Sequence, residues 1–267
     1  AVYFEAPSMR KINGRYYLVY SARNTGLYYF ISDRPDKDFR FGGRIHSTSD
    51  VGMNGYSEEE PCYPMGNTHG GLVELNGRYY IFDHRHTNNS SFCRQGVAEQ
   101  INIDAQGLIA QVESTSCGLN NGWLIGEGTY PAYIACVLYY EKTVPIDDRT
   151  ACITQDGEDR ESLPGQYIRG ISDGCIVGYR YFQGKELSNI RLTLRGRMKG
   201  TLYVTCHEEG GRMQDPEKIA VGSCICDIAA GDWEAITIPV QVRAGVYPLY
   251  FRFRGEGSLD LAEFTLE

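Results

Sequence analysis

Apolar and polar residues alternate along most of this chain in short runs that end at Gly, Asn, Asp or Pro. The runs NIRLTLRGR, residues 189–197, and YPLYFRFRG, residues 247–255, alternate cleanly, which places one face in a core and the other in water. A repeat of 3.6 residues, the sign of an amphipathic helix, is hard to find anywhere. The pattern therefore predicts an all-β chain.

Two tyrosine-rich hairpin signals recur in the first half of the chain. The segment SMRKINGRYYLVYS, residues 8–21, places Asn13-Gly14 between strand-forming flanks. The segment GGLVELNGRYYIFDHRH, residues 70–86, repeats this pattern at Asn76-Gly77, 63 residues later (76 minus 13). Asn-Gly populates the positive φ angles of a type I′ turn, so each copy predicts an antiparallel hairpin.

A repeat of this length, built from several short strands, favours the blades of a β-propeller. Blades present their innermost strands to a central channel, so the residues just before those strands gather at one end of the axis. The alternative is two unrelated Asn-Gly hairpins, which are common in β proteins.

The second half has a different pattern of strands and turns. Short strands follow one another at roughly regular spacing beyond Tyr130-Pro131, which is typical of a β-sandwich. The Gly- and Asn-rich passage SCGLNNGWLIGEGTYP, residues 116–131, separates the two patterns. We expect a partial propeller in residues 1–128 and a jelly-roll-like β-sandwich in residues 129–267, with the boundary between about 118 and 150.

Composition excludes some partners. The net charge of −8 argues against a nucleic acid, because phosphate binding needs clustered Lys and Arg. The longest nearly apolar run, residues 130–140, is too short for a membrane span, which takes about 20 residues. The 20 Tyr residues suit half-buried strand positions and also stacking against sugar rings.

The nine Cys residues are an odd number, and most lie in strand-like apolar runs. Cys224 and Cys226, one residue apart, are tight for a disulfide and atypical for zinc. Free buried thiols favour a reducing, cytoplasmic compartment. The chain opens at Ala1 in mid-pattern without Met, which we interpret as a processed or truncated chain, so secretion stays open.

Three segments together resemble glycoside hydrolase family 43. FEAPSMRKINGRYYLVYSA, residues 4–22, resembles the segment that carries the general acid, a Glu-(Gly/Ala)-Pro followed by a hairpin. GNTHGGLVELNGRYYIFDHRH, residues 66–86, resembles the last blades. FCRQGVAE and QVESTSCGLN, residues 92–99 and 111–120, resemble the end of the propeller. The likeness covers roughly residues 1–128 and is specific as a set.

The resemblance implies a five-bladed propeller that cleaves arabinofuranosyl or xylosyl linkages of plant cell-wall polysaccharides with inversion. It implies that Glu5 is the general acid; the alternative is a solvated carboxylate at a strand start. The family also uses an Asp base, and inversion needs acid and base about 6.5–9.5 Å apart. A second Asp tunes the acid's pKa.

Both Asp residues lie in blades that precede the Glu blade, and only four residues precede Glu5 here. We therefore expect about three blades. The chain is then a fragment, or is completed by a homo-oligomer or a partner chain, or has become a structural or binding unit.

The same resemblance implies further substrate contacts. His69 in GNTHGG corresponds to a His beside the axis that helps to hold a metal ion or water near the substrate. Arg94 in FCRQG corresponds to an Arg that reaches the substrate, and Asn67 is a candidate sugar contact. The alternatives are a turn His in a polar network and a surface salt bridge for Arg94. His84 and His86 share one strand face, so zinc is conceivable, but without a clear third ligand a core or rim role is favoured.

The second half resembles family 6 carbohydrate-binding modules. Gly174, Cys175 and Ile176 stand where such modules usually read Gly-Asp-Trp, so the sugar-stacking aromatic is missing at that spot. Tyr179 and Tyr181 either replace it or pack in the core, and Trp233 resembles a core or edge Trp of these modules. The resemblance implies a structural calcium ion with Asp260 as a ligand, and no organic cofactor.

Three functions stay open on the sequence alone. The first is a hydrolase acting on arabinoxylan or arabinan. The second is a non-catalytic carbohydrate-binding protein. The third is a structural unit in which open blade edges pair between subunits.

Overall fold

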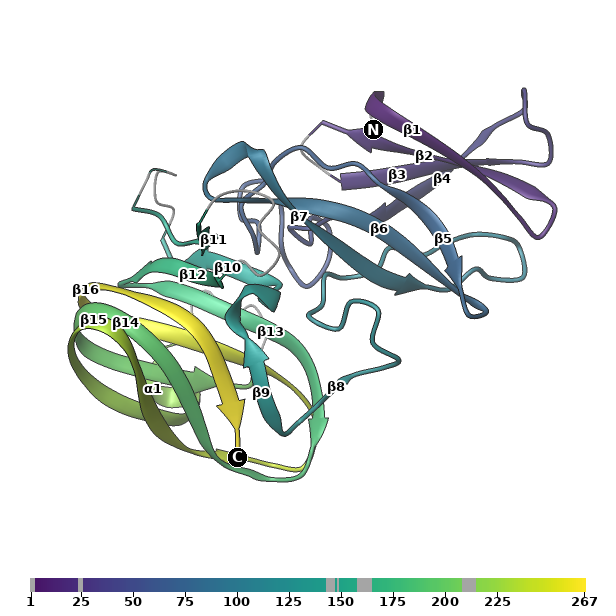
Figure 1. Cartoon of the computed structure of the whole chain (residues 1–267). Helices are drawn as coiled ribbons and strands as arrows, with labels where there is room; N and C mark the ends of the chain where they lie inside the picture. Colours follow the sequence, from purple (N-terminus) through teal and green to yellow (C-terminus); the bar gives the residue numbers. More distant parts are fainter. Residues whose placement is uncertain (1–2, 24–25, 143–146, 148, 158–164, 208–214) are drawn as a thin grey trace. The chain divides into compact units, whose positions relative to one another are not determined.

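The computed structural model describes residues 3–23, 26–142, 147, 149–157, 165–207 and 215–267. It divides the chain into two compact units, the first Ala1–His86 with Ser90–Leu119 and the second Thr87–Asn89 with Asn120–Glu267. Strands dominate both units, and the helices among the described residues are the short α1 (Pro216–Ile219) and the 3₁₀ turn η1 (Ala132–Ile134) (Figure 1). The predicted all-β class is confirmed, and none of the described helices has the length and apolar character of a membrane span.

The first sheet of the first unit is an antiparallel meander in which each strand pairs with the next along the chain. Its strands are β1 (Tyr3–Ile12), β2 (Arg15–Ala22), β3 (Gly26–Ser32) and β4 (Arg40–His46). Asn13 and Gly14 join β1 to β2 with φ angles of 51° and 84°, as a type I′ turn requires. A four-stranded meander of this kind is the plan of a propeller blade.

The second sheet begins in the same way. Its strands β5 (Gly71–Leu75), β6 (Arg78–Thr87) and β7 (Ser90–Ile101) lie in chain order. Asn76 and Gly77 join β5 to β6 with φ angles of 51° and 75°. The repeated motif therefore forms the first hairpin of each sheet, and the two hairpins belong to separate sheets rather than to one continuous sheet.

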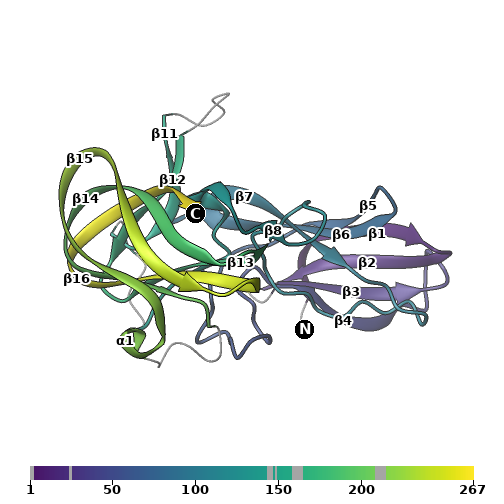
Figure 2. The same cartoon turned by 90° about the horizontal axis from the view of Figure 1, so that it is seen from below.

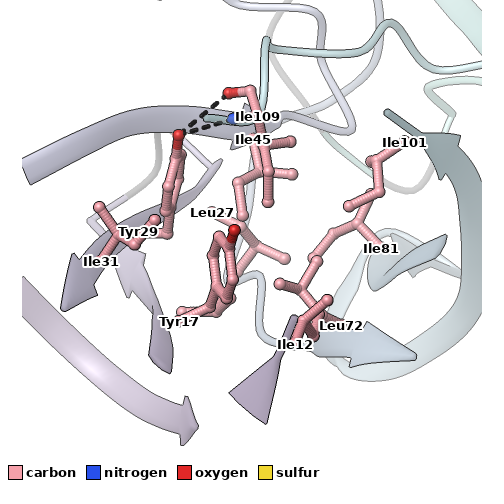
Figure 3. Packing of buried hydrophobic residues seen from close by; sticks show 11 residues of the cluster. Ile12, Tyr17, Leu27, Tyr29, Ile31, Ile45, Leu72, Ile81, Ile101 and Ile109 are labelled. Carbon is pink, nitrogen blue, oxygen red and sulfur yellow. Dashed lines mark hydrogen bonds between the residues drawn. The ribbon is translucent and has the colours of Figure 1, made fainter. Parts of the chain in front are cut away.

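Apolar residues from both sheets form one core (Figure 3). The seven strands and the segment after β7 supply it: Ile12, Tyr17, Val19, Leu27, Tyr29, Ile31, Ile45, Leu72, Ile81, Ile101 and Ile109. The first strands of the two sheets run close together, since a Cβ on Gly71 would stand 2.7 Å from Ser8 Oγ. This close approach is the arrangement expected of neighbouring blades.

The described residues of this unit form two sheets, and the chain beyond β7 adds only the isolated bridges Ile103↔Ile109 and His46↔Val112. Tyrosine hydroxyls of the first sheet form hydrogen bonds with backbone groups of the segment after β7. Tyr17 Oη donates to the Gly107 carbonyl at 2.8 Å, and Ile109 N–H donates to Tyr29 Oη at 2.8 Å. In this segment, hydrogen bonds with side chains therefore satisfy backbone groups that would pair with a neighbouring strand in a further sheet.

The second unit is one nine-stranded sheet that curls around its own core (Figures 1 and 2). Its strands are β8 (Leu124–Ile125), β9 (Gly128–Pro131), β10 (Val137–Tyr140), β11 (Cys152–Asp156), β12 (Gly165–Ser172), β13 (Cys175–Gly184), β14 (Leu187–Thr205), β15 (Ala220–Val242) and β16 (Gly245–Leu266). Strand β16 pairs with β14 along one side and with β13, β12 and β9 in turn along the other. These long strands pass from one layer to the next, as in a jelly roll.

Aromatic rings fill the core of this unit. The Tyr179 ring lies 4.5 Å from the Phe264 ring and 5.7 Å from the Phe251 ring, centroid to centroid. Its hydroxyl donates to the Ala132 carbonyl at 3.1 Å. Tyr179 is therefore a packing residue, the second of the two roles considered for it.

Replacing Gly77 by Ala is expected to destabilise the chain by about 1–2 kcal/mol, because a Cβ at positive φ strains the turn although no atom stands within 4 Å of it. The free energy of unfolding in urea measures the change. Gly96→Ala is the matched control, since its Cβ also meets no atom within 4 Å but its φ is not in the left-handed region. An equal loss in both variants would contradict the turn geometry.

Candidate functional site

Glu5 lies where the ladder of the first strand is interrupted. It stands opposite Ser21 of β2, and the register shifts on both sides of this pair. Ala6 adopts a φ of 57°, which costs a non-glycine residue free energy, and Pro7 has no N–H to give to the ladder. The Glu5 side chain is half-buried.

The glycine-rich turn before β5 lies beside this interruption. Thr68 is buried and its Oγ1 lies 3.4 Å from Ser21 Oγ, so Glu5 connects to the turn through its strand partner. A Cβ on Gly70 would stand 1.8 Å from the Phe82 carbonyl oxygen, which explains the need for glycine there. The turn is thus held against both β2 and β6.

His69 and Asn67 both contact histidines of β6. The rings of His69 and His84 meet edge to face with 4.3 Å between centroids. The Asn67 backbone N–H donates to His86 Nε2 at 3.1 Å. His69 is exposed whereas His84 is buried, so His84 lies beneath the predicted sugar contact.

Arg94 on β7 is exposed, and its Nε and Nη2 donate to the Ser91 carbonyl at 3.3 and 3.2 Å. Across the described part of the chain its guanidinium forms no ion pair, so the salt-bridge alternative is not observed. Its charge acts on His84 and His86. Of the predicted sugar contacts, His69 touches His84, and the charge of Arg94 acts on the same histidine.

Burial lowers the pKa of His84, and the neighbouring His69 and Arg94 lower it further, against the opposing charge of Asp83. Burial and the Arg94 charge also lower the pKa of His86. Among the described residues no group of three His, Cys, Asp or Glu side chains could hold a metal ion. The zinc alternative for these histidines therefore has no support in the fold.

A buried polar cluster close to these residues escaped the sequence analysis. His46 Nδ1 on β4 lies 2.9 Å from Asp83 Oδ2 on β6, and both side chains are almost fully buried. His46 Nε2 lies 3.2 Å from Ser114 Oγ, and Ser114 N–H donates to Asp50 Oδ1 at 2.7 Å. The one available signal was an acidic residue two positions after the core residue Ile81, on the strand face where the alternation calls for an apolar side chain.

Glu99 of β7 completes this cluster. Its carboxylate accepts hydrogen bonds from the Thr115 N–H at 2.6 Å and the Thr115 hydroxyl at 2.7 Å. Burial raises the pKa of Glu99 to about 7, and the nearby His46 and the Thr115 bonds hold it from rising further. Burial alone would lower the pKa of His46, but the hydrogen bond and charge of Asp83 raise it above its ordinary value.

The second unit places its own candidate residues in packing roles. Cys175 and Ile176, at the stretch where such modules usually read Gly-Asp-Trp, are buried. The Arg195 guanidinium lies over the rings of Tyr167 and Trp233, 4.6 and 4.4 Å from their centroids. The partly exposed Tyr181 ring contacts Trp123, with 5.2 Å between centroids.

Asp260 uses both carboxylate oxygens within the fold. Its Oδ1 accepts from the Gly170 N–H at 3.0 Å, and its Oδ2 accepts from Arg195 Nε at 3.0 Å. A bound cation would compete with the Arg195 charge. Nothing in these contacts points to a cation, and the calcium ion stays a prediction.

All nine cysteines are free thiols.

Raising the pH from 5 to 8 is expected to destabilise the first unit. Glu99 and His46 both bind a proton more tightly in the folded chain than in the unfolded one, so stability falls as pH rises. For Glu99 the loss runs from its ordinary pKa of 4.5 to about 7 and amounts to roughly 3 kcal/mol. For His46 the loss of stability continues as the pH rises through its raised pKa. The free energy of unfolding in urea, measured at several pH values, checks this prediction.

Glu99→Gln keeps an acceptor for the Thr115 N–H but cannot ionise. Its stability should therefore fall less steeply with pH than that of the wild type. If the free energy of unfolding fell equally with pH in both proteins, Glu99 would not be the source of the pH dependence.

Comparison with known proteins finds sequence relatives but no matching family model. No family model matches the chain. A protein of Thermoclostridium stercorarium named "Xylosidase/arabinosidase" is 39% identical over 274 aligned residues, which cover 99% of this chain and 56% of that protein. A "Beta-xylosidase" of Xylanibacter ruminicola is 32% identical over 114 residues, which cover 42% of this chain and 31% of that protein.

One solved structure supports the fold. A glycoside hydrolase family 43 arabinoxylan arabinofuranohydrolase from Bacillus subtilis, crystallised with cellotetraose, superposes with a TM-score of 0.50 at 15% identity, over 99% of this chain and 54% of that one. This chain thus spans little more than half the length of either protein that matches it throughout. It is related in sequence, over nearly its whole length, to a bacterial protein that bears the name xylosidase/arabinosidase.

Proposed function

We propose that this chain is part of a glycoside hydrolase of family 43 that removes arabinofuranosyl or xylosyl units from plant hemicellulose. The observation that carries the proposal is the 39% identity, over 99% of the chain, to a protein named xylosidase/arabinosidase. The contact between His69 and His84, with the charge of Arg94 acting on His84, supports it, because imidazole and guanidinium groups can form hydrogen bonds with sugar hydroxyls.

In this proposal Glu5 is the general acid. Its carboxylate forms no hydrogen bond or ion pair within the described part of the chain, so its oxygens can face a glycosidic oxygen. Inversion requires a base about 6.5–9.5 Å away, with room for a water molecule between base and sugar. No residue of this chain is assigned as that base, nor as the Asp that tunes the acid, and we infer that a further part of the protein or a partner chain supplies both.

His69, Arg94 and Asn67 are the sugar contacts in this proposal. A guanidinium presents several N–H donors in a fixed plane, which suits adjacent sugar hydroxyls. The side chain of Asn67 has both a donor and an acceptor, and its backbone is fixed by the His86 ring.

The alternative is a non-catalytic carbohydrate-binding protein. The absence of an assigned base favours it, and so does a second unit that resembles family 6 modules. In either case the partner is a plant cell-wall polysaccharide or oligosaccharide.

Arg94→Met is expected to weaken the binding of methyl β-D-xyloside and methyl α-L-arabinofuranoside about tenfold, because the sugar hydroxyls lose the charged N–H donors of the guanidinium. Isothermal titration calorimetry measures the dissociation constants. Arg10→Met is the matched control, since Arg10 is also exposed and its Nη1 donates to the neighbouring Met9 carbonyl. Equal affinities for wild type and both variants would place sugar binding outside this group.

The chain alone is expected to hydrolyse 4-nitrophenyl α-L-arabinofuranoside and 4-nitrophenyl β-D-xyloside slowly or not at all, because no base is assigned to it. Release of 4-nitrophenol measures the rate. Strong turnover that is lost in Glu5→Gln would show that the chain, as a monomer or an oligomer, holds complete machinery. Sugar binding that survives both Glu5→Gln and Arg94→Met, without turnover, would favour the carbohydrate-binding alternative.

A further inference from the structure

The first sheet is apolar on both faces. On one face, residues such as Tyr17 and Tyr29 pack in the core that is shared with the second sheet (Figure 3). The residues that alternate with them form a separate cluster, in which Tyr20 and Tyr28 are buried and Phe30 packs against them. An antiparallel sheet with one covered face commonly carries polar residues on the other. We call this second apolar face the outer face, and its side chains include Met9, Leu18, Tyr20, Tyr28, Phe30 and Phe41.

One row of side chains crosses the outer face from edge to edge. Met9 of β1 pairs with Leu18 of β2, Leu18 pairs with Phe30 of β3, and Phe30 pairs with Phe41 of β4. The two residues at the ends of this row are open to water, Met9 at 40% and Phe41 at 54% exposure. A continuous apolar surface of this kind typically marks an interaction site in a soluble protein.

The packing of the aromatic rings argues against a sugar as the occupant. Sugar stacking needs an open ring face with hydrogen-bonding groups around it. The Tyr20 ring lies 6.1 Å from the Tyr28 ring and 5.6 Å from the Phe30 ring, and the Arg44 guanidinium lies 5.0 Å from the Tyr28 centroid. Tyr20 and Tyr28 are therefore only 2% and 8% exposed. The outer face is a closed apolar layer rather than a set of open platforms.

The core face of the same sheet shows which kind of partner suits such a layer. There the first sheet packs on the second sheet, and β1 lies close to β5, since a Cβ on Gly71 would stand 2.7 Å from Ser8 Oγ. Sheets stack face to face about 10 Å apart through apolar side chains that interdigitate. The outer face spans the same four strands with the same kind of side chain, so a further sheet can stack on it in the same way.

The proposed hydrolase requires a further part that could contain such a sheet. The Thermoclostridium stercorarium protein matches 99% of this chain with only 56% of its own length, so much of that protein lies outside the match. A sheet on the outer face would place its first strand beside β1, as β5 lies beside β1 on the core face. Because β1 carries Glu5, that strand could bring a carboxylate within the range that inversion requires.

We propose that the outer face is the docking surface for a further β-sheet of the same enzyme, whose apolar face covers Met9, Leu18, Phe30 and Phe41. The inference rests on the proposed function, since the docked sheet belongs to the part of the hydrolase that supplies the base. A second copy of this chain, presenting its own outer face, is the competing occupant.

The test uses a chimera in which this chain replaces the matching residues of the Thermoclostridium stercorarium protein. Met9 is the probe, because hydrogen peroxide adds one oxygen atom to an exposed thioether and is reduced to water. Peptide mass spectrometry measures the rate of this oxidation. Met9 should be oxidised at least about tenfold more slowly in the chimera than in the isolated chain, because the docked sheet excludes peroxide from the sulfur.

Phe41→Asp places a charge in the row that the docked sheet should bury. In the chimera it should bring Met9 oxidation to within about twofold of the rate in the isolated chain, because an unpaired carboxylate opposes burial. Phe41→Leu stays apolar and should leave Met9 protected. Phe92→Asp is the matched control, since Phe92 lies on β7 of the second sheet and is 92% exposed, and it should also leave Met9 protected.

The isolated chain separates the two occupants. Its Met9 should be oxidised at one rate at every chain concentration. Slower oxidation at higher concentration, reversed by Phe41→Asp, would assign the outer face to a second copy and overturn the inference. If the chimera does not fold, the unmatched part of the Thermoclostridium stercorarium protein is added to the isolated chain as a separate polypeptide, and Met9 oxidation should slow as its concentration rises.

Failure of the inference and failure of the proposed function give different results. Equal oxidation of Met9 in the chimera and in the isolated chain overturns the inference, and the proposed function stands if that chimera hydrolyses the 4-nitrophenyl pentosides. Protection of Met9 without hydrolysis supports the docking surface, and the proposed function then fails.

Discussion

A hydrogen bond between two buried side chains, His46 and Asp83, links the two sheets of the first unit. It joins the last strand of one sheet to the middle strand of the next, with 2.9 Å between Nδ1 and Oδ2. Removing both groups from water is costly, and the cost is offset only because their remaining polar atoms are also bonded. Asp83 Oδ1 accepts the His84 N–H, and His46 Nε2 reaches Ser114. Asp83 thus bonds both His46 and the backbone of His84, the histidine whose ring contacts His69.

The apolar core alone would define the arrangement of the sheets less sharply. Ile and Leu contacts are not directional, and sheets that pack through them can slide by small amounts at little cost. A buried hydrogen-bonded pair tolerates no such slide, because a displaced partner leaves an uncompensated polar group. The first unit thus combines a core that drives association with a polar cluster that fixes position. The Glu99–Thr115 contact extends the same control to the segment after β7.

The sequence predicted the features that local chemistry decides. Asn-Gly at residues 13–14 and 76–77 dictates a tight hairpin wherever it stands between strand formers, and alternation then sets which side chains face inward. It could not predict contacts that depend on tertiary packing. His46 and Asp83 are 37 residues apart and neither belongs to a motif. The sequence left two roles open for Tyr179, and only the contacts of its ring with Phe251 and Phe264 of β16 decide for packing.

The two ends of the first strands serve different purposes. At one end, the Asn-Gly turns close β1 and β5 with backbone angles that suit their residues, so these ends add stability. At the other end stand Ala6, with its unfavourable φ of 57°, and Gly70, pressed against the Phe82 carbonyl. Such irregular backbone persists only where the surroundings enforce it, and it tends to mark functional positions. Glu5 and His69 lie beside these two residues, so the candidate chemistry stands where the ladder is broken, on strands that the opposite hairpins hold in place.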